Sequence, residues 1–468
     1  MSNEHRRERR RLTPGVRFLL SAVSVCFLLF LSGFAFRYCL SLFVVGDEYL
    51  IRLPGRDPIA QVDSNQGLDL FGSANTVTQT GRATILAAGD LMTHLPIVRS
   101  GASGSGYSFE YIFQHVSPYI AGADYAVVNL ETTLAGTDGK EYTGYPKFNA
   151  PDAIASSAYH VGFDMMLTAN NHCYDYGTAG LLRTLDVVRD AGLNTLGTIS
   201  SVEENRYIVK DINGIKIGMV NYTYADIKDD RNTFVLNDMQ VDSKSAGLIN
   251  IFDYANLDLF YDEMQNHISG MRAAGAEAIV LFIHWGDQFS VTPSSTQQII
   301  AQKMCDLGVD VIAGSHPHVV QPITLLTSTD GASQTLCMYS MGNILSNQRA
   351  DNIALETGHS EDGLLFSFTF VKYSNGEVHV EYADLMPTWV LVKGNENSKT
   401  FHILPLDIEV EDWNEIYSLD GDQAANANKS LERTNAVVYQ GLTAVKQQLQ
   451  RQQEERGHAL GTFTGGVG

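Results

Sequence analysis

Five short apolar runs, each closed by polar residues, restrict the fold of this chain more than any other feature. They are ATILAAGD, YAVVNLE, FDMMLTANNH, EAIVLFIHWGD and VDVIAGSHPH. Short continuous apolar runs are typical of buried strands in a largely parallel sheet. Segments 177–192 and 257–275 have helical spacing and stop at glycine. The alternation of strands and helices predicts an α/β fold.

Two other segments predict β-hairpins. Alternating apolar residues flank Asn213-Gly214 in one segment and Asn375-Gly376 in the other. An Asn-Gly pair in this setting is the strongest short-range hairpin signal. We therefore expect an α/β sandwich with added hairpins.

The residues that close the apolar runs predict a metal site. The carboxyl ends of strands in an open α/β sheet meet at one edge, where ligands bind. Carboxylate, amide and imidazole groups suit Zn, Mn or Fe. Their number exceeds what one four-coordinate ion needs, which favours two divalent ions with a bridging carboxylate and an activated water. The candidate ligands are Asp90, Glu131, Asn171, His284, His316 and His318, with His172 beside them.

His316 and His318 flank Pro317 directly after an apolar run. Residues i and i+2 of an extended backbone face the same side, and proline disfavours the helical region for the residue before it. We therefore expect an extended segment that aims both imidazoles at one place. Alone, the pair also fits two loop histidines bonded to the backbone, so the metal interpretation depends on the other strand ends.

Each of the other candidates has a structural alternative. Asp90 also fits an ordinary turn, Glu131 a strand end before a helix cap, and His284 a core histidine. Cys173 is expected to pack behind the site, and a bridge between Cys305 and Cys337 is left open. Five further histidines lack a strand-end context and are expected to be structural or surface residues: His94, His115, His160, His267 and His359.

The amino terminus predicts a membrane anchor. Residues 1–46 carry a net charge of +5, and Phe18–Phe36 is a run of 19 residues without a charge. Such a run is long enough to span a hydrocarbon core of about 30 Å, and the arginines should stay in the cytoplasm. A cleaved signal peptide is the alternative. The remaining residues carry 25 basic and 51 acidic groups, a net charge of −26, which excludes nucleic acid as a partner.

These features predict five regions of the chain. Residues 1–17 form a cytoplasmic basic segment, 18–45 a transmembrane anchor and 46–81 an extracellular stalk rich in small polar residues. Residues 82–416 form the main domain. Residues 417–468 form a tail that is helical and then flexible.

Seven segments between Ala83 and Asn347 resemble, in order, the blocks of the CapA family of capsule, or poly-γ-glutamate, synthesis proteins. They are AAGDLM, VVNLETTLAG, PKFNAP, FDMMLTANNHCYDYGTAGLLRTLDVVRDAGLNTLG, VLFIHWGDQF, VIAGSHPHVVQP and YSMGNILSNQ. The domain of that family resembles calcineurin-like metallophosphoesterases. The resemblance implies a four-layer α/β/β/α metallophosphoesterase-like sandwich with two metal ions.

The resemblance also implies roles for single residues. Asp90 resembles the first-motif aspartate, Asn171 the amide ligand, and His172 the neighbouring histidine that acts in the chemistry. His284, His316 and His318 resemble the three histidine ligands. The sequence departs from the phosphoesterase pattern twice: His94 is displaced from the usual Asp-x-His spacing, and Glu131 stands in for the bridging aspartate.

The function implied by the resemblance is that of a membrane-anchored extracellular protein in synthesis, export or retention of a poly-γ-glutamate capsule. Its partners would be the membrane, other subunits of a polymer synthesis complex and an anionic cell-surface polymer. One alternative is a metal-dependent phosphoesterase or amidase that acts on another cell-surface substrate. The other is a scaffold with a vestigial metal site. The acidic domain argues against a broad basic groove, although bound cations would invert the local charge.

Overall fold

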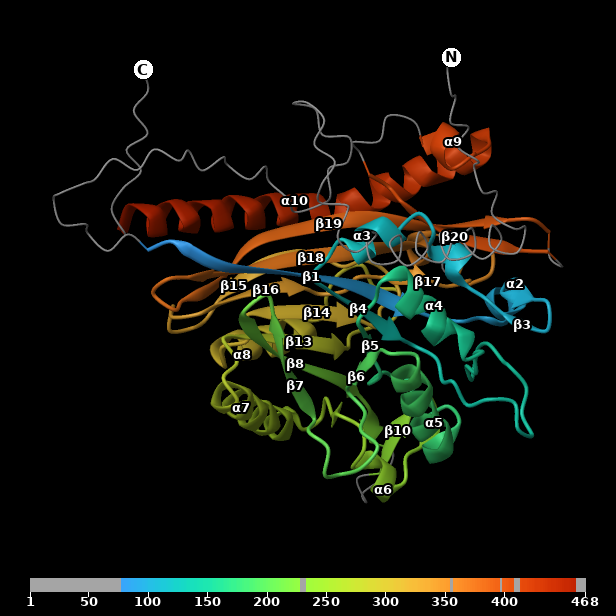
Figure 1. Cartoon of the computed structure of the whole chain (residues 1–468), viewed down its shortest axis with the longest axis horizontal. Coiled ribbons are helices and arrows are strands. Elements are labelled where there is room, and N and C mark those ends of the chain that lie inside the picture. Colours follow the sequence, from blue (N-terminus) through green and yellow to red (C-terminus); the bar gives the residue numbers. More distant parts are fainter. Residues whose placement is uncertain (1–76, 228–232, 354–356, 396–397, 408–412, 460–468) are drawn as a thin grey trace, which may run out of the picture. The chain divides into compact units, whose positions relative to one another are not determined.

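The computed structural model describes residues 77–227, 233–353, 357–395, 398–407 and 413–459 (Figure 1). No helix within these ranges is long and apolar enough to cross a membrane. The predicted cytoplasmic segment and transmembrane anchor lie outside the described residues, as do residues 46–76 of the predicted stalk.

The first sheet has a parallel half and an antiparallel half. Its strand order is β20-β19-β18-β1-β4-β5-β6, and β17 also pairs with β1. Strands β1, β4, β5 and β6 run parallel, whereas β18, β19 and β20 are antiparallel. The bounds are β1 Gln79–Leu91, β4 Tyr125–Leu130, β5 Met165–Leu167, β6 Asn194–Leu196, β17 Asn343–Leu345, β18 Asp362–Tyr373, β19 Val378–Lys393 and β20 Thr400–Pro405.

The second sheet has the order β12-β8-β13-β14-β16-β15, and β7 pairs with β8. Asn213 and Gly214 have φ values of 53° and 83°, as the predicted hairpin turn between β7 and β8 requires. Its bounds are β7 Tyr207–Ile212, β8 Ile215–Tyr224, β12 Ile251–Phe252, β13 Ala278–His284, β14 Val311–Ser315, β15 Ile323–Thr327 and β16 Gln334–Met338. The five predicted runs form β1, β4 and β5 in the first sheet and β13 and β14 in the second.

Helices cover one face of each sheet, and the other two faces share a core. Val127 of the first sheet and Phe282 of the second belong to one buried cluster. Helices α4 (Ala153–Val161) and α5 (Gly177–Asp190) pack on the first sheet. Helices α7 (Leu257–Ala273) and α8 (Ser295–Asp306) pack on the second (Figure 1). The predicted mixed α/β class is confirmed.

Short elements complete the described part of the chain. Their bounds are α2 Leu95–Ser100, β2 Ala102–Ser103, β3 Gly106–Tyr107, η2 Glu110–Phe113, α3 Ser117–Ala121, β9 Asp226–Ile227, β10 Phe234–Leu236, β11 Met239–Gln240, α6 Ser243–Ala246, η3 His359–Glu361 and α9 Trp413–Ile416. Strands β10 and β11 form a small hairpin whose tip contacts the site described below.

The long carboxyl-terminal helix α10 (Gly421–Ala459) lies along β19 and β15 (Figure 1). It contributes Val438, Val445 and Leu449 to the core shared by the two sheets. Gly441 permits the close approach, because a Cβ atom there would overlap the carbonyl oxygen of Ile323. Each buried aliphatic side chain of this kind stabilises the fold by about 1.5–3 kcal/mol. This part of the region expected to be a tail is therefore integrated into the core.

The three described cysteines are free and buried. Cys305 lies on α8 and Cys337 on β16, and the bridge that the sequence left open is not formed. Cys173 belongs to a small apolar cluster with Leu181 and Leu185 of α5. All three thiols thus act as apolar packing groups in this structure.

Candidate metal centre

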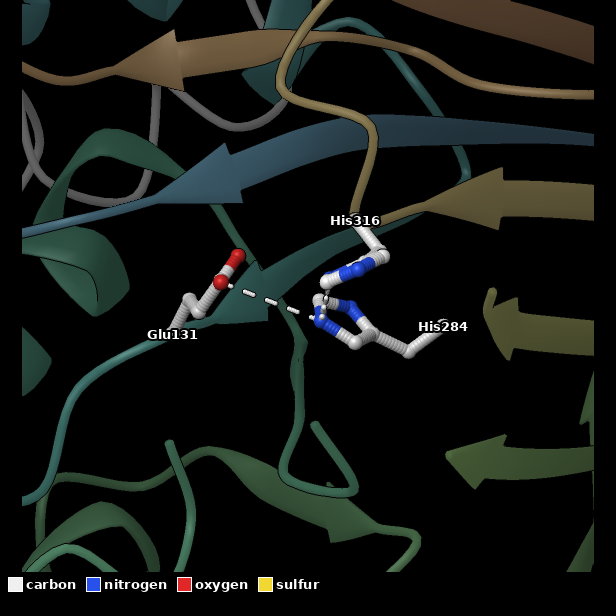
Figure 2. A group of neighbouring side chains, drawn as sticks. All are labelled: Glu131, His284 and His316. Atoms are coloured by element: carbon white, nitrogen blue, oxygen red, sulfur yellow. Dashed lines mark hydrogen bonds and ion pairs between the residues drawn. The ribbon is translucent and has the colours of Figure 1, made fainter. Parts of the chain in front are cut away.

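The carboxyl ends of strands from both sheets meet at one buried polar cluster. Asp90 lies at the end of β1, and Glu131 directly follows β4. His284 ends β13, and His316 directly follows β14. Figure 2 shows the carboxylate of Glu131 and the imidazoles of His284 and His316 turned toward one another. Because the neighbouring strands are parallel, each presents its polar end on the same side.

Two groups of three side chains have the geometry of metal ligands. One contains Glu131, His284 and His316, and the other contains Asp90, Glu131 and His318. Within each group the ligand atoms lie within 4.8 Å of one another, and every member is buried. Glu131 belongs to both groups. Two ligand groups that share one carboxylate match the arrangement expected for two neighbouring ions.

The shared carboxylate of Glu131 faces the histidines of both groups. Its Oε1 atom lies 3.8 Å from His284 Nε2 and 3.6 Å from His318 Nε2. The same oxygen is buried and has no hydrogen-bond partner among the described residues. A buried carboxylate oxygen without a partner is costly, whereas a cation at this point would satisfy it. The donor set therefore fits a divalent ion.

Asn171 joins the first group. Its Oδ1 atom lies 2.8 Å from His284 Nε2, and His316 Nδ1 lies 3.1 Å from that same nitrogen. A protonated Nε2 would have to share its one hydrogen between these two atoms, and an unprotonated Nε2 would face the Asn171 oxygen as a second acceptor. One amide oxygen and two imidazole nitrogens around one point resemble ligands arranged for an ion.

Burial shifts the titration of these groups toward their neutral forms. Burial and the nearby Asp90 raise the pKa of Glu131 well above its usual range. Burial and the other imidazoles lower the pKa values of His284 and His316 well below theirs. The cluster favours neutral imidazoles, which is the form that binds metal.

Asn129 is a member of the site that the sequence interpretation missed. Its Nδ2 atom donates to Asp90 Oδ1 at 2.8 Å and lies 3.4 Å from Glu131 Oε2. It therefore holds the two carboxylates in place from the end of β4. Its Oδ1 atom accepts from Asn170 Nδ2 at 3.2 Å, which fixes its orientation. Its position two residues before Glu131 in the same apolar run was the available signal.

Two hydroxyl groups orient the histidines from behind. Ser315 Oγ lies 2.9 Å from His284 Nδ1, and Tyr224 OH lies 3.2 Å from His316 Nε2. Partners of this kind set the tautomer and ring orientation of metal-ligating histidines. Tyr224 comes from the end of β8, in a segment whose sequence showed only a hairpin.

His172 and Asp175 form a buried pair beside the ligand groups. His172 Nδ1 lies 2.8 Å from Asp175 Oδ2, and that oxygen also accepts from Phe148 N at 2.7 Å. With Nδ1 donating to Asp175, Nε2 is left to accept or deliver a proton. The predicted catalytic histidine therefore has an orienting carboxylate, which the sequence interpretation missed three residues further along the chain.

The backbone at His316 and His318 differs from the expected extended segment. Their φ values are 97° and 57°, in a region that residues other than glycine rarely adopt. The backbone N–H of His316 donates to Asp90 Oδ2 at 3.2 Å, and His318 Nδ1 lies 3.0 Å from the same oxygen. Conformations of this kind cost about 1–3 kcal/mol each and cluster at functional sites. The expectation of an extended His-Pro-His was wrong, because contacts with Asp90 outweigh the preference that proline imposes.

His94 is half-buried next to the site but belongs to neither ligand group. Its Nδ1 atom accepts from the backbone of Asn347 at 3.2 Å, and its ring packs edge-on against Phe148. Burial lowers the pKa of His94 to about 3, so the ring is neutral. These contacts agree with the structural role expected for it.

Comparisons with known proteins point to one family. Residues 84–348 match the model of the family described as bacterial capsule synthesis protein PGA_cap. The capsule biosynthesis protein CapA of Bacillus anthracis is 28% identical over 263 residues, which is 55% of this chain and 59% of that protein. The PGA biosynthesis protein CapA of Bacillus subtilis (strain 168) is 26% identical over 245 residues, covering 51% of this chain and 57% of that protein.

A third relative comes from a different genus. A probable polyglutamine synthesis accessory protein of Mycobacterium tuberculosis (strain H37Rv) is 26% identical over 220 residues. The match covers 43% of this chain and 52% of that protein. The chain thus spans between half and three fifths of the length of these three relatives.

Proposed function

Because this chain belongs to the bacterial capsule synthesis protein PGA_cap family, we propose that it is an accessory protein in the synthesis of a capsule of the poly-γ-glutamate type. The relatives named for capsule, PGA and polyglutamine synthesis support this assignment. We further propose that it works through a metal-dependent, hydrolase-like site. The observation that carries this step is the buried Glu131 carboxylate shared by two ligand groups.

The ligands divide between two neighbouring positions. His284, His316 and Asn171 would hold one divalent ion, Asp90 and His318 the other, and Glu131 would contact both. Ions bound there would supply a water that is nucleophilic near neutral pH and would polarise the scissile group. The donors suit Mn, Zn or Fe.

His172 would act as the general acid or base of the site. Its Nδ1 atom is held by Asp175, so Nε2 is the atom that exchanges a proton with the attacking water or the leaving group. The site lies in a buried cluster from which bulk water is largely excluded, which strengthens such interactions. The bond cleaved or transferred would be an amide or a phosphodiester of a cell-surface polymer.

The fold and the amino terminus add to this proposal. The two sheets with a shared core and helices outside support the four-layer α/β/β/α metallophosphoesterase-like arrangement.

The basic segment and the apolar run at the amino terminus support a single-pass anchor with the main domain outside the cytoplasm. A reporter that is active only outside the cytoplasm, fused after residue 80, should be active. A silent reporter on a protein that is present would contradict this topology.

The hydrolase proposal is tested with His172→Ala in a strain whose capsule polymer depends on this protein. The variant should keep its metal and its fold, because His172 belongs to neither ligand group. Polymer formation should fall by about 10²–10⁴-fold, the usual contribution of a general acid or base. His379→Ala, a change far along the chain on β19, is the matched control and should leave polymer unchanged.

The same experiment separates the alternatives. Normal polymer from His172→Ala at wild-type protein levels, with loss of polymer on deletion of residues 77–468, would favour a scaffold. A phosphoesterase or amidase acting on another substrate is favoured by the His172–Asp175 pair beside the ligand groups. It would show metal-dependent hydrolysis of such a substrate with normal polymer in the His172→Ala strain.

A further inference from the structure

Lys147 directly precedes Phe148, which contacts His172, and among the described residues its cation has no carboxylate partner. It lies on the segment between β4 and α4, and its side chain is exposed. Its Nζ atom contacts the sulfur of Met239 at 2.8 Å. Among the described residues no carboxylate oxygen lies within 4.0 Å of that nitrogen. A thioether is a weak acceptor and leaves the charge of an ammonium group uncompensated.

The chain at Lys147 is tied directly to the His172–Asp175 pair. The next residue, Phe148, donates its backbone N–H to Asp175 Oδ2 at 2.7 Å, and this oxygen also contacts His172 Nδ1. The ring of Phe148 packs edge-on against the ring of His172, with centroids 4.7 Å apart. The backbone of Lys147 therefore adjoins Phe148, the residue that contacts the proposed acid–base group.

Two further hydrogen bonds fix the backbone around Lys147. Thr143 Oγ1 donates to the carbonyl oxygen of Lys147 at 2.5 Å. Asn237, at the tip of the hairpin formed by β10 and β11, donates to the carbonyl oxygen of Pro146 at 2.7 Å. The same Asn237 amide donates to Asp175 Oδ1 at 2.7 Å. The position of this lysine is thus built into the site rather than left to a free loop.

Neighbouring cations are already engaged. Lys140 lies over the ring of Tyr176 and contacts the carbonyl oxygen of Ala135. Arg183 forms a bidentate ion pair with Asp152. Judged from the described residues, Lys147 is the cation between β4 and α4 that remains available to a ligand. Residues 47–468 carry a net charge of −26, and against this background Lys147 offers a local attraction for an anionic substrate.

We propose that Lys147 binds a free carboxylate of the substrate polymer and so positions the adjacent linkage at His172. This inference rests on the proposed function. The recognised group would be the free α-carboxylate of a unit in a γ-linked glutamate chain. An ammonium group offers three donors that rotate to meet such a carboxylate. Lys147 is then a substrate-positioning residue rather than a metal ligand.

The test measures binding of a γ-linked glutamate oligomer to the full chain in detergent, by titration calorimetry. Lys147→Gln should weaken binding about fivefold, the equivalent of an exposed ion pair of about 1 kcal/mol. Lys147→Arg should retain most of the affinity because it keeps the charge. The control is Lys429→Gln, an exposed lysine on α10, which should bind as the wild type does. Added salt should weaken the wild type more than Lys147→Gln.

Two results would overturn the inference. One is equal affinity of the wild type and Lys147→Gln, and the other is failure of the wild type to bind the oligomer. Neither decides the proposed function, which the polymer yield of His172→Ala tests separately. Weakened binding by Lys147→Gln together with normal polymer in His172→Ala would keep Lys147 as the carboxylate-binding residue and remove the hydrolase step.

Discussion

Two regions of this molecule bury carboxylates, and they balance the charge in different ways. At the candidate metal centre, Asp90 and Glu131 lie among imidazoles and amides. Where α10 joins the first sheet, Asp362 and Glu381 each face an arginine of the helix. The contrast separates a structural use of buried charge from a functional one.

The helix attachment is charge-balanced by the chain itself. Arg433 donates to both oxygens of Asp362, at 2.9 Å from Nε and 2.7 Å from Nη2, and Ser430 Oγ adds a third bond at 2.6 Å. Arg456 Nη2 pairs with only one oxygen of Glu381, Oε1, at 2.6 Å. The bidentate pair of Arg433 with Asp362 fixes geometry as well as charge. This region needs no outside cation.

The candidate centre has no such internal balance. Neither Asp90 nor Glu131 forms an ion pair with a lysine or arginine among the described residues. Two close carboxylates repel each other unless one is protonated or a cation binds between them. The difference teaches that a buried carboxylate without a basic partner is the feature that indicates a ligand site.

The largest expected effect comes from breaking the balanced region. Arg433→Met leaves the Asp362 carboxylate buried and unpaired, and removing one partner of such a pair typically costs about 3–5 kcal/mol. The loss should appear in chemical unfolding both with and without a chelator, because no metal is involved. A loss that depended on the chelator would break the comparison.

The next effect concerns the shared carboxylate. Glu131→Gln should abolish binding at both positions, so metal analysis should show the wild-type ions lost together. At a metal concentration 10-fold above the Kd of each position, binding stabilises the wild type by about 1.4 kcal/mol per ion, and the variant should lack this gain at both positions.

Removing the metal should abolish this difference in stability. In excess chelator, Glu131→Gln should unfold at a temperature no lower than the wild type, because burial and Asp90 raise the pKa of Glu131 and favour its neutral form, which glutamine resembles. The control is His379→Gln on β19, which should follow the wild type in both conditions. Retention of both ions by Glu131→Gln would remove the shared-ligand interpretation.

A smaller effect is expected behind the ligands. Asn129→Ala removes the amide that holds Asp90 and Glu131, and partners of this kind change metal affinity by about 10–100-fold. Competition with a chelator of known affinity measures the change. Asn428→Ala, an exposed change on α10, should have no effect. Wild-type affinity in Asn129→Ala would show that Asn129 serves only packing.

The smallest effect should come from an exposed pair on the same long helix. Lys446 Nζ lies 2.7 Å from Asp384 Oδ1, but their side chains are 51% and 40% exposed. Lys446→Met should therefore cost less than about 1 kcal/mol in chemical unfolding. A loss comparable with that of Arg433→Met would mean that burial is not what distinguishes the two pairs.

The candidate ligands could be recognised from sequence because each directly follows an apolar run. That pattern depends on a local rule, in which a buried strand ends in polar residues at a shared edge. It identified the segments of β1, β4, β5, β13 and β14 and the residues at their ends. It could not assign these strands to two separate sheets, because pairing between strands is not encoded in the periodicity of each one.

What the sequence did not reveal depends on contacts between distant segments. Asn237 reaches Asp175 from a hairpin tip, and the φ values of His316 and His318 follow from their bonds to Asp90. The core role of α10 rests on a few aliphatic residues within a stretch rich in glutamine and glutamate. The spacing of these aliphatic residues predicts a buried helix face, but the composition of the stretch is typical of flexible tails and led to the prediction of a tail.

The candidate ligands divide equally between the two sheets, with Asp90, Glu131 and Asn171 from the first and His284, His316 and His318 from the second. The contact between Asp90 and His318 joins positions 228 residues apart in the sequence. Ions held there would act as cross-links between the sheets, and closing so long a loop restricts the unfolded chain more than closing a short one. The supply of divalent ions in the surrounding compartment would then set how much of the protein persists in its native form, in addition to whether it is active.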